Sequence, residues 1–416
     1  MLILKKGFVN EKKSDNIKNM DEMDEILNRS IAEVLPSKEE FKKVLLSGKK
    51  LRIYIGCDAT GTQLHIGNAT NFMILERLRQ LGHEVIVLFG DFTALIGDPS
   101  DKTAARIMLT KEQIEENMKT WKSQVEKVLD FNEKNNPAKI LKNSEWNSKL
   151  KFSDVINLAS NFTVQQMLER DMFEERLKQE KPIYLHEFLY PLTQGYDSVA
   201  MDVDVEMGGT DQKFNMLAGR TLQKKYHNKE KFVITTTLLV NPKTGKKLMS
   251  KSEGTYIGLN DEPDNMFGKV MNLPDEAIIQ VFIDCTYVPL DEIKQKETDL
   301  KNNKVNPMNL KLDLAEELVK IYHGQAAAEK ARENFIKLFQ KKEIPEDIKE
   351  IKTKTGESLE DTLIKNKIIP SKSEFRRLIK AGAIDIDNQT INDVNYFVKQ
   401  SIVVRVGKKK FLRIVI

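Results

Sequence analysis

Two segments that lie far apart in the chain hold residues able to bind phosphate. In the first, His65 and Asn68 stand three positions apart at the end of a loop that starts at Gly56. If the loop opens a helix, both side chains leave the same face of its first turn, where unpaired backbone N–H groups favour an anion. The alternative is that His65 only makes a structural hydrogen bond there. The loop matches neither of the common glycine-rich phosphate-binding patterns.

The second segment is rich in lysine and follows a strand-like apolar run over residues 233–240. Residues 246–254 have the sequence Lys-Lys-Leu-Met-Ser-Lys-Ser-Glu-Gly. Each ammonium group can contact a phosphate oxygen as a point charge, although a lone cluster of this kind is usually a solvated turn. In a doubly wound sheet both segments can meet at the carboxyl ends of the strands. Together they predict a nucleotide site.

The elements that must position these segments follow an α/β pattern. Residues 51–55 form an apolar run that ends at Gly56, residues 69–81 carry apolar side chains at helical spacing, and residues 85–90 form a second apolar run. A strand, a helix and a strand with short connections predict a parallel sheet with right-handed crossovers. The predicted fold class is therefore α/β, with a Rossmann-like doubly wound parallel sheet in the catalytic domain.

The composition and the hydrophobic pattern change several times along the chain, and each change predicts a domain boundary. In the last domain we expect one helix over residues 372–381 and three strands, which gives a small α+β fold. The predicted segments are a helical N-terminal extension over 1–50, the catalytic domain over 51–260 with a helical insertion at about 103–189, a helical domain over 261–340, a linker over 341–356 and the small domain over 357–416.

Composition excludes several classes of protein. The 416 residues are too many for one core, and 40% hydrophobic with 31% charged residues is typical of a folded globular chain. Two cysteines exclude a disulfide scaffold and a four-cysteine zinc site, and the five histidines show no metal-ligand spacing, so no metal site is predicted. We find no apolar run of about 18 residues and no signal peptide, so we expect a cytoplasmic protein without membrane contact.

Charge is unevenly placed along the chain. From Ser371 to Ile416 ten Lys and Arg residues stand against four Asp and Glu residues, an excess of six, whereas the whole chain carries only +4. A basic end on a body that is close to neutral suggests contact with a polyanion. A surface that only keeps the protein in solution is the alternative.

Five ordered motifs between about residues 51 and 259 resemble one known family. The segments 65–68 and 248–252 resemble the HIGH and KMSKS signatures of class I aminoacyl-tRNA synthetases, with Asn68 and Leu248 as departures from them. Three more motifs resemble the bacterial tyrosyl-tRNA synthetases. These motifs are Tyr54-x-Gly-x-Asp58, Tyr190-x-x-x-Gln194-x-x-Asp197 and Gly208-Gly-Thr-Asp211-Gln212. The last domain is similar to the RNA-binding module named after small-subunit ribosomal protein four, so the resemblance implies a small α+β RNA-binding domain after the helical, anticodon-side domain.

The resemblance implies a reaction in two steps. L-Tyrosine and ATP give tyrosyl-adenylate and pyrophosphate, and the tyrosyl group then passes to the terminal adenosine of tRNA in protein synthesis. A carboxylate nucleophile is already ionised at neutral pH, so catalysis depends on positioning and on stabilising charge at the phosphates. ATP is then a substrate with Mg²⁺ carried by the nucleotide. The family also implies a homodimer formed through the 103–189 insertion.

The resemblance further implies a role for each site residue, and no metal ligands. The residues implied in phosphate chemistry are His65, Asn68, Lys251, Lys102 and Arg106. Those implied in binding ATP are Gly56, Asp58, Gly67, Gly209, Asp211, Ser250 and Lys251. Those implied in binding tyrosine are Tyr54 and Asp197 at the phenol, Asp98, Tyr190 and Gln194 at the α-ammonium group, and Gln212 at the carboxyl end. Those implied in binding RNA are Arg376, Arg377, Lys380, Lys408, Lys409 and Lys410.

Other functions stay open at this point. A tryptophanyl enzyme would share the sheet and both signatures, although Tyr54 and Asp197 favour a substrate with a hydroxyl group. A non-catalytic RNA-binding protein on a decayed synthetase scaffold would account for Asn68 and Leu248. A different nucleotidyltransferase on the same fold is the third alternative, which the basic end of the chain disfavours. For Tyr190, Gln194 and Asp197, the alternative role is plain packing of one helix face.

Overall fold

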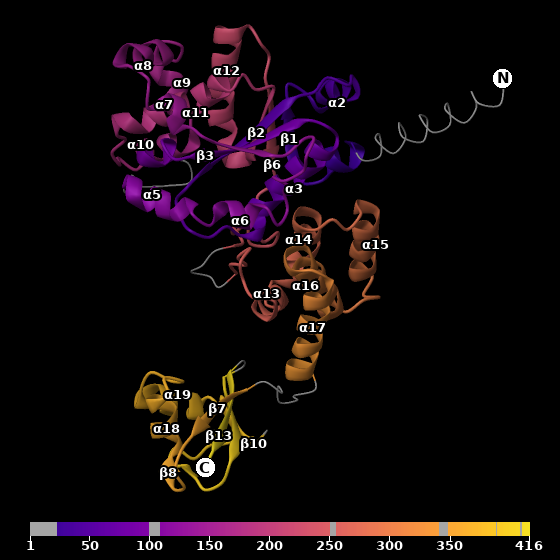
Figure 1. The fold of residues 1–416 in the computed structure, drawn as a ribbon, viewed down its shortest axis with the longest axis vertical. Coiled ribbons are helices and arrows are strands. Elements are labelled where there is room, and N and C mark those ends of the chain that lie inside the picture. Colours follow the sequence, from indigo (N-terminus) through magenta and orange to yellow (C-terminus); the bar gives the residue numbers. More distant parts are fainter. Residues whose placement is uncertain (1–22, 100–108, 250–254, 341–347, 388, 408–409) are drawn as a thin grey trace, which may run out of the picture. The chain divides into compact units, whose positions relative to one another are not determined.

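The computed structural model describes residues 23–99, 109–249, 255–340, 348–387, 389–407 and 410–416. Two compact units divide the chain, Met1–Ala328 and Glu329–Ile416. Figure 1 shows that the first unit combines a sheet and its surrounding helices with a further group of helices, and that the second is a smaller unit of short helices and strands. Within the described part of the chain, no helix is both long enough and apolar enough to cross a membrane.

A six-stranded sheet with the order β1-β6-β5-β2-β3-β4 forms the centre of the first unit. All neighbours are parallel except β1, which runs antiparallel to β6. The residues of β3 from Val85 to Gly90 are all buried, as expected for a parallel strand covered on both faces. The strands are β1 (Ile31–Leu35), β2 (Arg52–Asp58), β3 (Glu84–Gly90), β4 (Lys139–Lys142), β5 (Val205–Gly209) and β6 (Phe232–Thr236).

The strand order is that of a doubly wound sheet. The chain leaves β2 through α3 (Ile66–Gln80) toward β3 on one side, and leaves β5 through α12 (Lys213–His227) toward β6 on the other. The connections after β2 and β5 therefore diverge, and their divergence leaves a crevice at the carboxyl ends of these two neighbouring strands. The predicted Rossmann-like fold class is confirmed.

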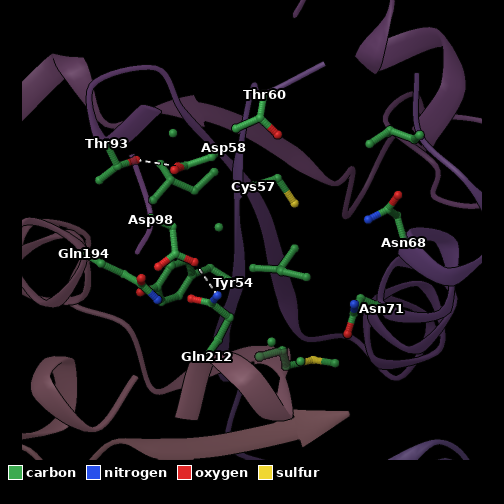
Figure 2. A pocket seen from close by; sticks show the side chains of 18 of the residues that line it. Tyr54, Cys57, Asp58, Thr60, Asn68, Asn71, Thr93, Asp98, Gln194 and Gln212 are labelled. Carbon is green, nitrogen blue, oxygen red and sulfur yellow. Dashed lines mark hydrogen bonds between the residues drawn. The ribbon is translucent and has the colours of Figure 1, made fainter. Parts of the chain in front are cut away.

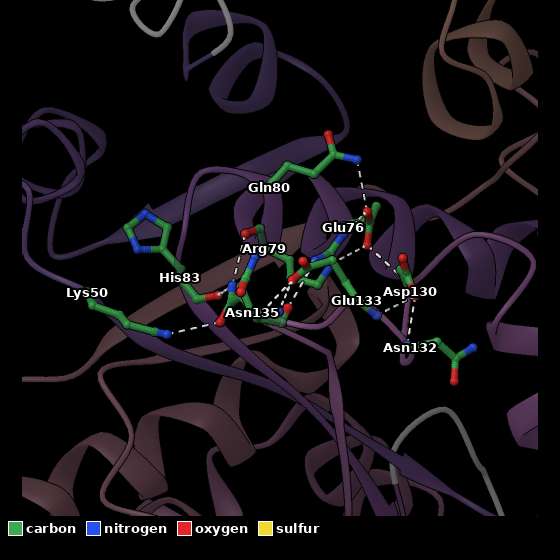
Figure 3. Close-up of polar contacts among 10 residues, drawn as sticks. Lys50, Glu76, Arg79, Gln80, His83, Asp130, Asn132, Glu133 and Asn135 are labelled. Atoms are coloured by element: carbon green, nitrogen blue, oxygen red, sulfur yellow. Dashed lines mark hydrogen bonds and ion pairs between the residues drawn. The ribbon is translucent and has the colours of Figure 1, made fainter.

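The far end of α3 is fixed by a polar cluster, drawn in Figure 3. Both carboxylate oxygens of Glu76 accept hydrogen bonds from Arg79, at 2.7 and 2.8 Å. Glu76 also accepts from the Gln80 side chain at 2.9 Å and from the backbone N–H of Asp130 at 3.1 Å. These bonds hold the helix whose first turn carries His65 and Asn68.

The prediction of a wholly helical extension over residues 1–50 is wrong for its described part. Residues 23–28 and α2 (Lys38–Leu46) are helical, but β1 lies between them and pairs with β6. Residues 1–22 lie outside the described residues. The strand covers the edge of β6, which would otherwise expose unpaired backbone groups. Only Val34 of β1 is buried, and its run Ile-Ala-Glu-Val-Leu is too short for the sequence pattern to distinguish a strand from a helical turn.

The insertion at about 103–189 is helical in its described part, except for one strand. Its third described element, β4, joins the parallel sheet beside β3, so this part of the prediction is corrected. The strand has only four residues and a lysine at each end, which hid it from the sequence pattern. The helices are α5 (Lys111–Met118), α6 (Trp121–Val125), α7 (Ser144–Asn147), α8 (Phe152–Ala159), α9 (Val164–Leu168), α10 (Asp171–Lys178) and η1 (Leu185–Phe188).

The chain from Pro263 to Gln340 is helical. The helices α13 and α16 pack against each other and bury apolar side chains such as Phe267 and Leu314. The elements are α13 (Pro263–Met271), η3 (Asp275–Ala277), α14 (Ile278–Cys285), α15 (Leu290–Lys301), α16 (Pro307–His323), α17 (Gln325–Phe335) and a π-helical turn η4 (Ile336–Gln340).

The second unit has a five-stranded sheet with the order β10-β9-β12-β13-β7. Phe375 and Leu359, from the two helices that lie between residues 348 and 416, belong to its buried core. The parallel pairing of β7 with β13 corrects the linker predicted over 341–356, since residues 349–352 belong to this sheet. The elements are β7 (Lys349–Lys352), β8 (Glu357–Ser358), α18 (Leu359–Lys365), α19 (Lys372–Lys380), β9 (Ile384–Ile386), β10 (Gln389–Thr390), β11 (Phe397–Val398), β12 (Ile402–Val406) and β13 (Lys410–Val415).

Candidate active site

A cavity of about 440 Å³ lies at the crevice between the carboxyl ends of β2 and β5. Figure 2 looks into it, with Tyr54 and Asp98 on one side and Asn68 and Asn71 of α3 on the other. Most of the predicted site residues that the structure describes line it. They are Tyr54, Gly56, Asp58, His65, Asn68, Asp98, Tyr190, Gln194, Asp197, Gly209, Asp211 and Gln212.

The remaining predicted residues of this site fall into two groups. Lys102, Arg106, Ser250 and Lys251 lie outside the described residues. Gly67 is described but is not among the residues that line the cavity. A Cβ atom at Gly67 would lie 3.2 Å from two ring atoms of His65 and 3.2 Å from Leu239, so the glycine leaves room for the imidazole.

The first turn of α3 forms one end of the cavity, which we call the phosphate end. The backbone N–H of Asn68 donates to Nδ1 of His65 at 3.2 Å, and the backbone N–H of His65 donates to Oδ1 of Asn68 at 3.0 Å. His65 therefore does make the structural hydrogen bond considered from the sequence. Because Oδ1 of Asn68 is engaged in this capping box, its Nδ2 is the atom left to donate to an anion.

The chain after the lysine-rich segment lies on this turn. The backbone N–H of Ile66 donates to the carbonyl of Ile257 at 3.1 Å, and the ring of Tyr256 meets the ring of His65 edge-on with centroids 5.6 Å apart. Near the start of the segment, Leu248 is buried and its N–H donates to the carbonyl of Leu239. The departure from lysine at position 248 thus has a packing role.

The opposite end of the cavity, which we call the phenol end, is centred on Asp197 and Tyr54. Asp197 of α11 (Leu189–Ala200) accepts hydrogen bonds from Trp146 at 2.7 Å, Asn147 at 2.8 Å and Asn143 at 3.1 Å. Burial raises the pKa of Asp197 to about 8, against the effect of these three donors. The hydroxyl of Tyr54 lies 3.0 Å from that of Ser198, and burial raises the pKa of Tyr54 as well.

The three residues predicted around an ammonium group have partners of their own. Tyr190 donates to Asp58 at 3.0 Å, and Nε2 of Gln194 donates to Glu206 at 3.0 Å. Asp98 accepts from Nε2 of Gln212 at 2.6 Å, a bond drawn in Figure 2. Tyr190 thus connects the predicted amino-acid group to Asp58, which was predicted to bind ATP.

Asp58 and Asp211 lie close to two glycines. Asp58 accepts a hydrogen bond from Thr93 at 2.6 Å, and a Cβ atom at Gly90 would lie only 2.1 Å from the same carboxylate. A Cβ atom at Gly209 would lie 2.5 Å from Oδ1 of Asp211. At Gly56 a Cβ atom would meet nothing within 4 Å, so the backbone there borders open cavity. A larger residue at position 90 or 209 would therefore displace the carboxylate of Asp58 or of Asp211 from its place at the cavity.

Sequence reasoning missed several residues of the cavity wall. Asn71 could have been found, because it lies three positions after Asn68 on the same face of α3. Asn143 follows β4, and it could not be found while that strand was missed. The lining residues that were not predicted include Cys57, Thr60, Asn71, Thr93, Trp121 and Asn143.

The predicted RNA-binding residues that the structure describes are exposed in the second unit, and several have partners. Arg377 donates to Glu374 at 2.7 and 2.8 Å, and Arg376 lies 3.9 Å from Glu360. Lys380 is exposed at the end of the same helix, α19. Lys410 donates to the carbonyl of Ile368 at 3.2 Å. Lys408 and Lys409 lie outside the described residues.

The fold and the cavity together define a class. A doubly wound sheet with a nucleotide-sized cavity at its switch point, closed by a HIGH-like helix start, is the arrangement of a class I aminoacyl-tRNA synthetase. Residues 46–340 match the family model "tRNA synthetases class I (W and Y)", and residues 340–414 match "Tyrosine--tRNA ligase SYY-like C-terminal domain".

Curated relatives give the narrower family. The tyrosine–tRNA ligase of Carboxydothermus hydrogenoformans is 43% identical over 94% of this chain and 97% of its own length, and that of Thermotoga maritima is 42% identical over 95% and 97%. A C-terminally truncated mitochondrial tyrosyl-tRNA synthetase from Aspergillus nidulans shares the fold, with a TM-score of 0.64 at 20% identity over 76% of this chain and 94% of that one. The chain belongs to the tyrosine–tRNA ligases, as predicted.

Proposed function

We propose that the cavity carries out the first step of tyrosine–tRNA ligation, the formation of tyrosyl-adenylate. The observation that carries the proposal is that one cavity of about 440 Å³ has Asp197 and Tyr54 at one end and the His65–Asn68 turn at the other. A tyrosine with its phenol at the phenol end directs its carboxylate toward a nucleotide at the phosphate end. Asp98, Tyr190, Gln194 and Gln212, which also line the cavity, would hold its ammonium and carboxyl groups.

The chemistry requires positioning more than proton transfer. A carboxylate oxygen of tyrosine attacks the α-phosphorus of ATP, a new P–O bond forms, and the bond to the β-phosphate breaks as pyrophosphate leaves. His65 and Asn68 would donate to the phosphate oxygens on which charge develops. Lys251 would act from the lysine-rich segment, and Lys102 and Arg106 would face the pyrophosphate.

The same framework accounts for the nucleotide and the second step. Gly56, Gly67 and Gly209 would let backbone approach ATP, while Asp58, Asp211 and Ser250 would contact it. A ribose hydroxyl of the terminal tRNA adenosine then attacks the tyrosyl carbonyl carbon, and AMP and a proton are released. No cluster of three metal-binding side chains occurs among the described residues. We propose that Mg²⁺ enters with the nucleotide substrate.

We also propose a homodimer formed through the helical insertion. Several large apolar side chains there face solvent in the single chain, including Phe152 at 81%, Leu185 at 84% and Val164 at 66% exposure. A group of exposed apolar residues of this size is typical of an interaction surface. Sedimentation analysis at micromolar concentration should give twice the chain mass, and a monomer mass would contradict the proposal.

The second unit would bind tRNA through Arg376, Arg377, Lys380 and the basic turn at 408–410. Exposed Lys and Arg side chains give affinity for phosphate that falls steeply with salt. Arg377 would have to exchange its carboxylate partner Glu374 for an RNA phosphate. Because such an enzyme works where translation takes place, we propose a cytoplasmic location.

One experiment tests the proposed activation reaction directly. The purified chain is assayed for ATP–pyrophosphate exchange with each of the twenty amino acids in turn. We expect exchange with tyrosine alone, because only a phenol satisfies both Asp197 and Tyr54. Exchange driven by tryptophan and not by tyrosine would overturn the assignment. Absence of all exchange, with retained binding of structured RNA, would instead support a non-catalytic protein on this scaffold.

A further inference from the structure

A fully buried ion pair lies behind the phenol end and outside the predicted site. The side chains of Lys231 and Glu206 are 0% and 1% exposed, and Nζ of Lys231 donates to Oε2 of Glu206. Gly219 of α12 makes room for them, since a Cβ atom there would lie 2.5 Å from Nζ of Lys231. Burying two charges costs solvation energy that the pair recovers only in part, so stability alone is a weak reason for such a pair.

The first branch of this network fixes the amide of Gln194. Nε2 of Gln194 donates to Oε1 of Glu206 at 3.0 Å. A carboxylate accepts hydrogen bonds but cannot donate them, so the amide nitrogen must face Glu206 and the amide oxygen must face away from it. Gln194 lines the cavity, and its Oε1 is buried without a hydrogen-bond partner among the described residues. This oxygen can therefore accept a hydrogen bond from the ammonium group of an amino acid.

The second branch fixes the hydroxyl of Tyr54. Ser198 Oγ donates to Oε2 of Glu206 at 3.2 Å and accepts from Lys231 at 2.9 Å. Since Ser198 has only one proton, its bond to Tyr54 at 3.0 Å must be donated by the Tyr54 hydroxyl. The oxygen of Tyr54 then offers a lone pair to the cavity, which a substrate phenol can use and phenylalanine cannot. Tyr54 and Glu206 are also direct neighbours in the pairing of β2 with β5.

We propose that Glu206, held in place by Lys231, is a positioning residue that sets the orientation of both Gln194 and Tyr54 for tyrosine binding. The inference rests on the proposed function and deepens it, because it assigns the selection of the amino acid to groups that do not touch it. One carboxylate thereby orients an acceptor for the ammonium group at one place and an acceptor for the phenol at another. Figure 2 shows Gln194 and Tyr54, the two groups so oriented, on the same side of the cavity.

Two double variants test this role, both with Lys231→Met so that no buried charge is left unpaired. Glu206→Leu removes the acceptor for Gln194, whereas Glu206→Gln keeps an amide oxygen that can accept from it. In pyrophosphate exchange, we expect the Leu variant to raise the KM for tyrosine by about 10-fold or more and the Gln variant by about 3-fold or less. The KM for ATP should change by less than about two-fold in both. An equal tyrosine KM in the two variants, or an unchanged one in the Leu variant, overturns the proposal.

A matched control separates positioning from general stability. Glu76 and Arg79 form another ion pair of low exposure, at 2.7 Å, and neither lines the cavity. Glu76→Leu with Arg79→Met should lower the melting temperature and leave the tyrosine KM unchanged. Failure of the proposed function itself looks different, since the wild-type chain would then show no exchange with tyrosine. A rise in tyrosine KM with the control pair as large as with Glu206→Leu overturns the proposal.

A milder variant keeps the inference testable if the double variants do not fold. Ser198→Ala leaves the ion pair in place and removes only the hydroxyl that joins it to Tyr54. We expect the preference for tyrosine over phenylalanine in exchange to fall by about 5-fold or more, from the loss of one oriented hydrogen bond. A preference that stays within about two-fold of the wild type overturns the Tyr54 branch.

Discussion

The two ends of the cavity are built in different ways. At the phenol end, Asp197 and Tyr54 form hydrogen bonds with side chains of other residues. The partners of Asp197 lie between residues 143 and 147, and the partner of Tyr54 is Ser198 of α11. At the phosphate end, the described groups are the first turn of a helix, its capping box and backbone pairing with residues 257–259. The first end depends on side-chain identity, and the second depends mainly on backbone geometry.

In the proposed function this difference follows from what each end would recognise. A phenol differs from a phenyl ring by one hydroxyl group, so selection requires oriented partners that are left unsatisfied when the hydroxyl is absent. A triphosphate is a large anion, and any set of donors with positive charge will attract it. We therefore expect substitutions at the phenol end to change which amino acid is used, and substitutions at the phosphate end to change how fast it is used.

The largest effect should come from Asp197→Asn, which tests the phenol end. The new amide N–H group would face Asn143, which already donates at this position. Tyrosine–tRNA ligases as a family prefer tyrosine over phenylalanine by a factor of about 10⁵. We expect this preference to be about 10³-fold smaller in the variant. The measurement is kcat/KM for exchange with tyrosine and with phenylalanine. Asp202→Asn, at an exposed position just after the same helix, is the control, and unchanged selectivity in Asp197→Asn would remove the phenol role.

A smaller effect is expected from Lys251→Ala at the phosphate end. Loss of one charged donor should lower the rate of adenylate formation by about 10²-fold, while the Kd for tyrosine stays within about two-fold. Single-turnover kinetics and calorimetric titration measure the two quantities separately. Lys243→Ala is the matched control, because Lys243 is an exposed lysine that, like Lys251, follows β6 in the chain. A large loss of tyrosine affinity in Lys251→Ala would break the division between the two ends.

Removal of residues 341–416 should spare both ends. The second unit has its own buried core, so the cut leaves no exposed half of a core in the first unit. A cut at Ser371 would instead divide that core between α18 and α19. We expect tRNA charging to fall by about 10-fold or more and pyrophosphate exchange to stay within about two-fold. Equal losses in both assays would contradict a role confined to tRNA binding.

A separate test of the phenol end is a dependence of stability on pH. The pKa of Asp197 is raised to about 8 in the folded chain, so folding favours the protonated form. Its contribution to stability is full below the unfolded-state pKa near 4 and is lost as the pH rises through about 8, by up to about 1.4 kcal/mol per pH unit. Urea unfolding from pH 5 to 8 should show the stability advantage of the wild type over Asp197→Asn decreasing. An advantage that grows with pH would show Asp197 to be ionised in the folded state.

The parts of the fold that the sequence predicts are those with strong local patterns. The apolar runs of β2 and β3 and the helical stripe of α3 were identified, because each pattern is complete within a short stretch of sequence. Strand β5 was not identified, because a charged residue, Glu206, interrupts the apolar pattern expected of a buried strand. That carboxylate can be buried only because Lys231 reaches it from the start of β6, a pairing that appears only once the sheet has formed.

The same limit applies to the candidate site. Residues within the motifs, such as Asn68 and Asp197, were identified by resemblance and do line the cavity. The groups that orient them were missed: Trp146 lies about fifty positions from Asp197 in the chain and belongs to a one-turn helix after a strand of four residues. Hydrogen-bond partners at such separation are set by tertiary packing, which a single sequence does not display.

The hydrogen bond from Tyr190 to Asp58 has a thermodynamic consequence. In the proposed function Tyr190 would contact the amino acid and Asp58 the nucleotide, so the binding of either substrate would affect a group that the other uses. Linkage then requires that whatever ATP does to the affinity for tyrosine, tyrosine does to the affinity for ATP by the same factor. The hydrogen bond between the Tyr190 phenol and the Asp58 carboxylate would thus couple the binding of tyrosine to the binding of ATP.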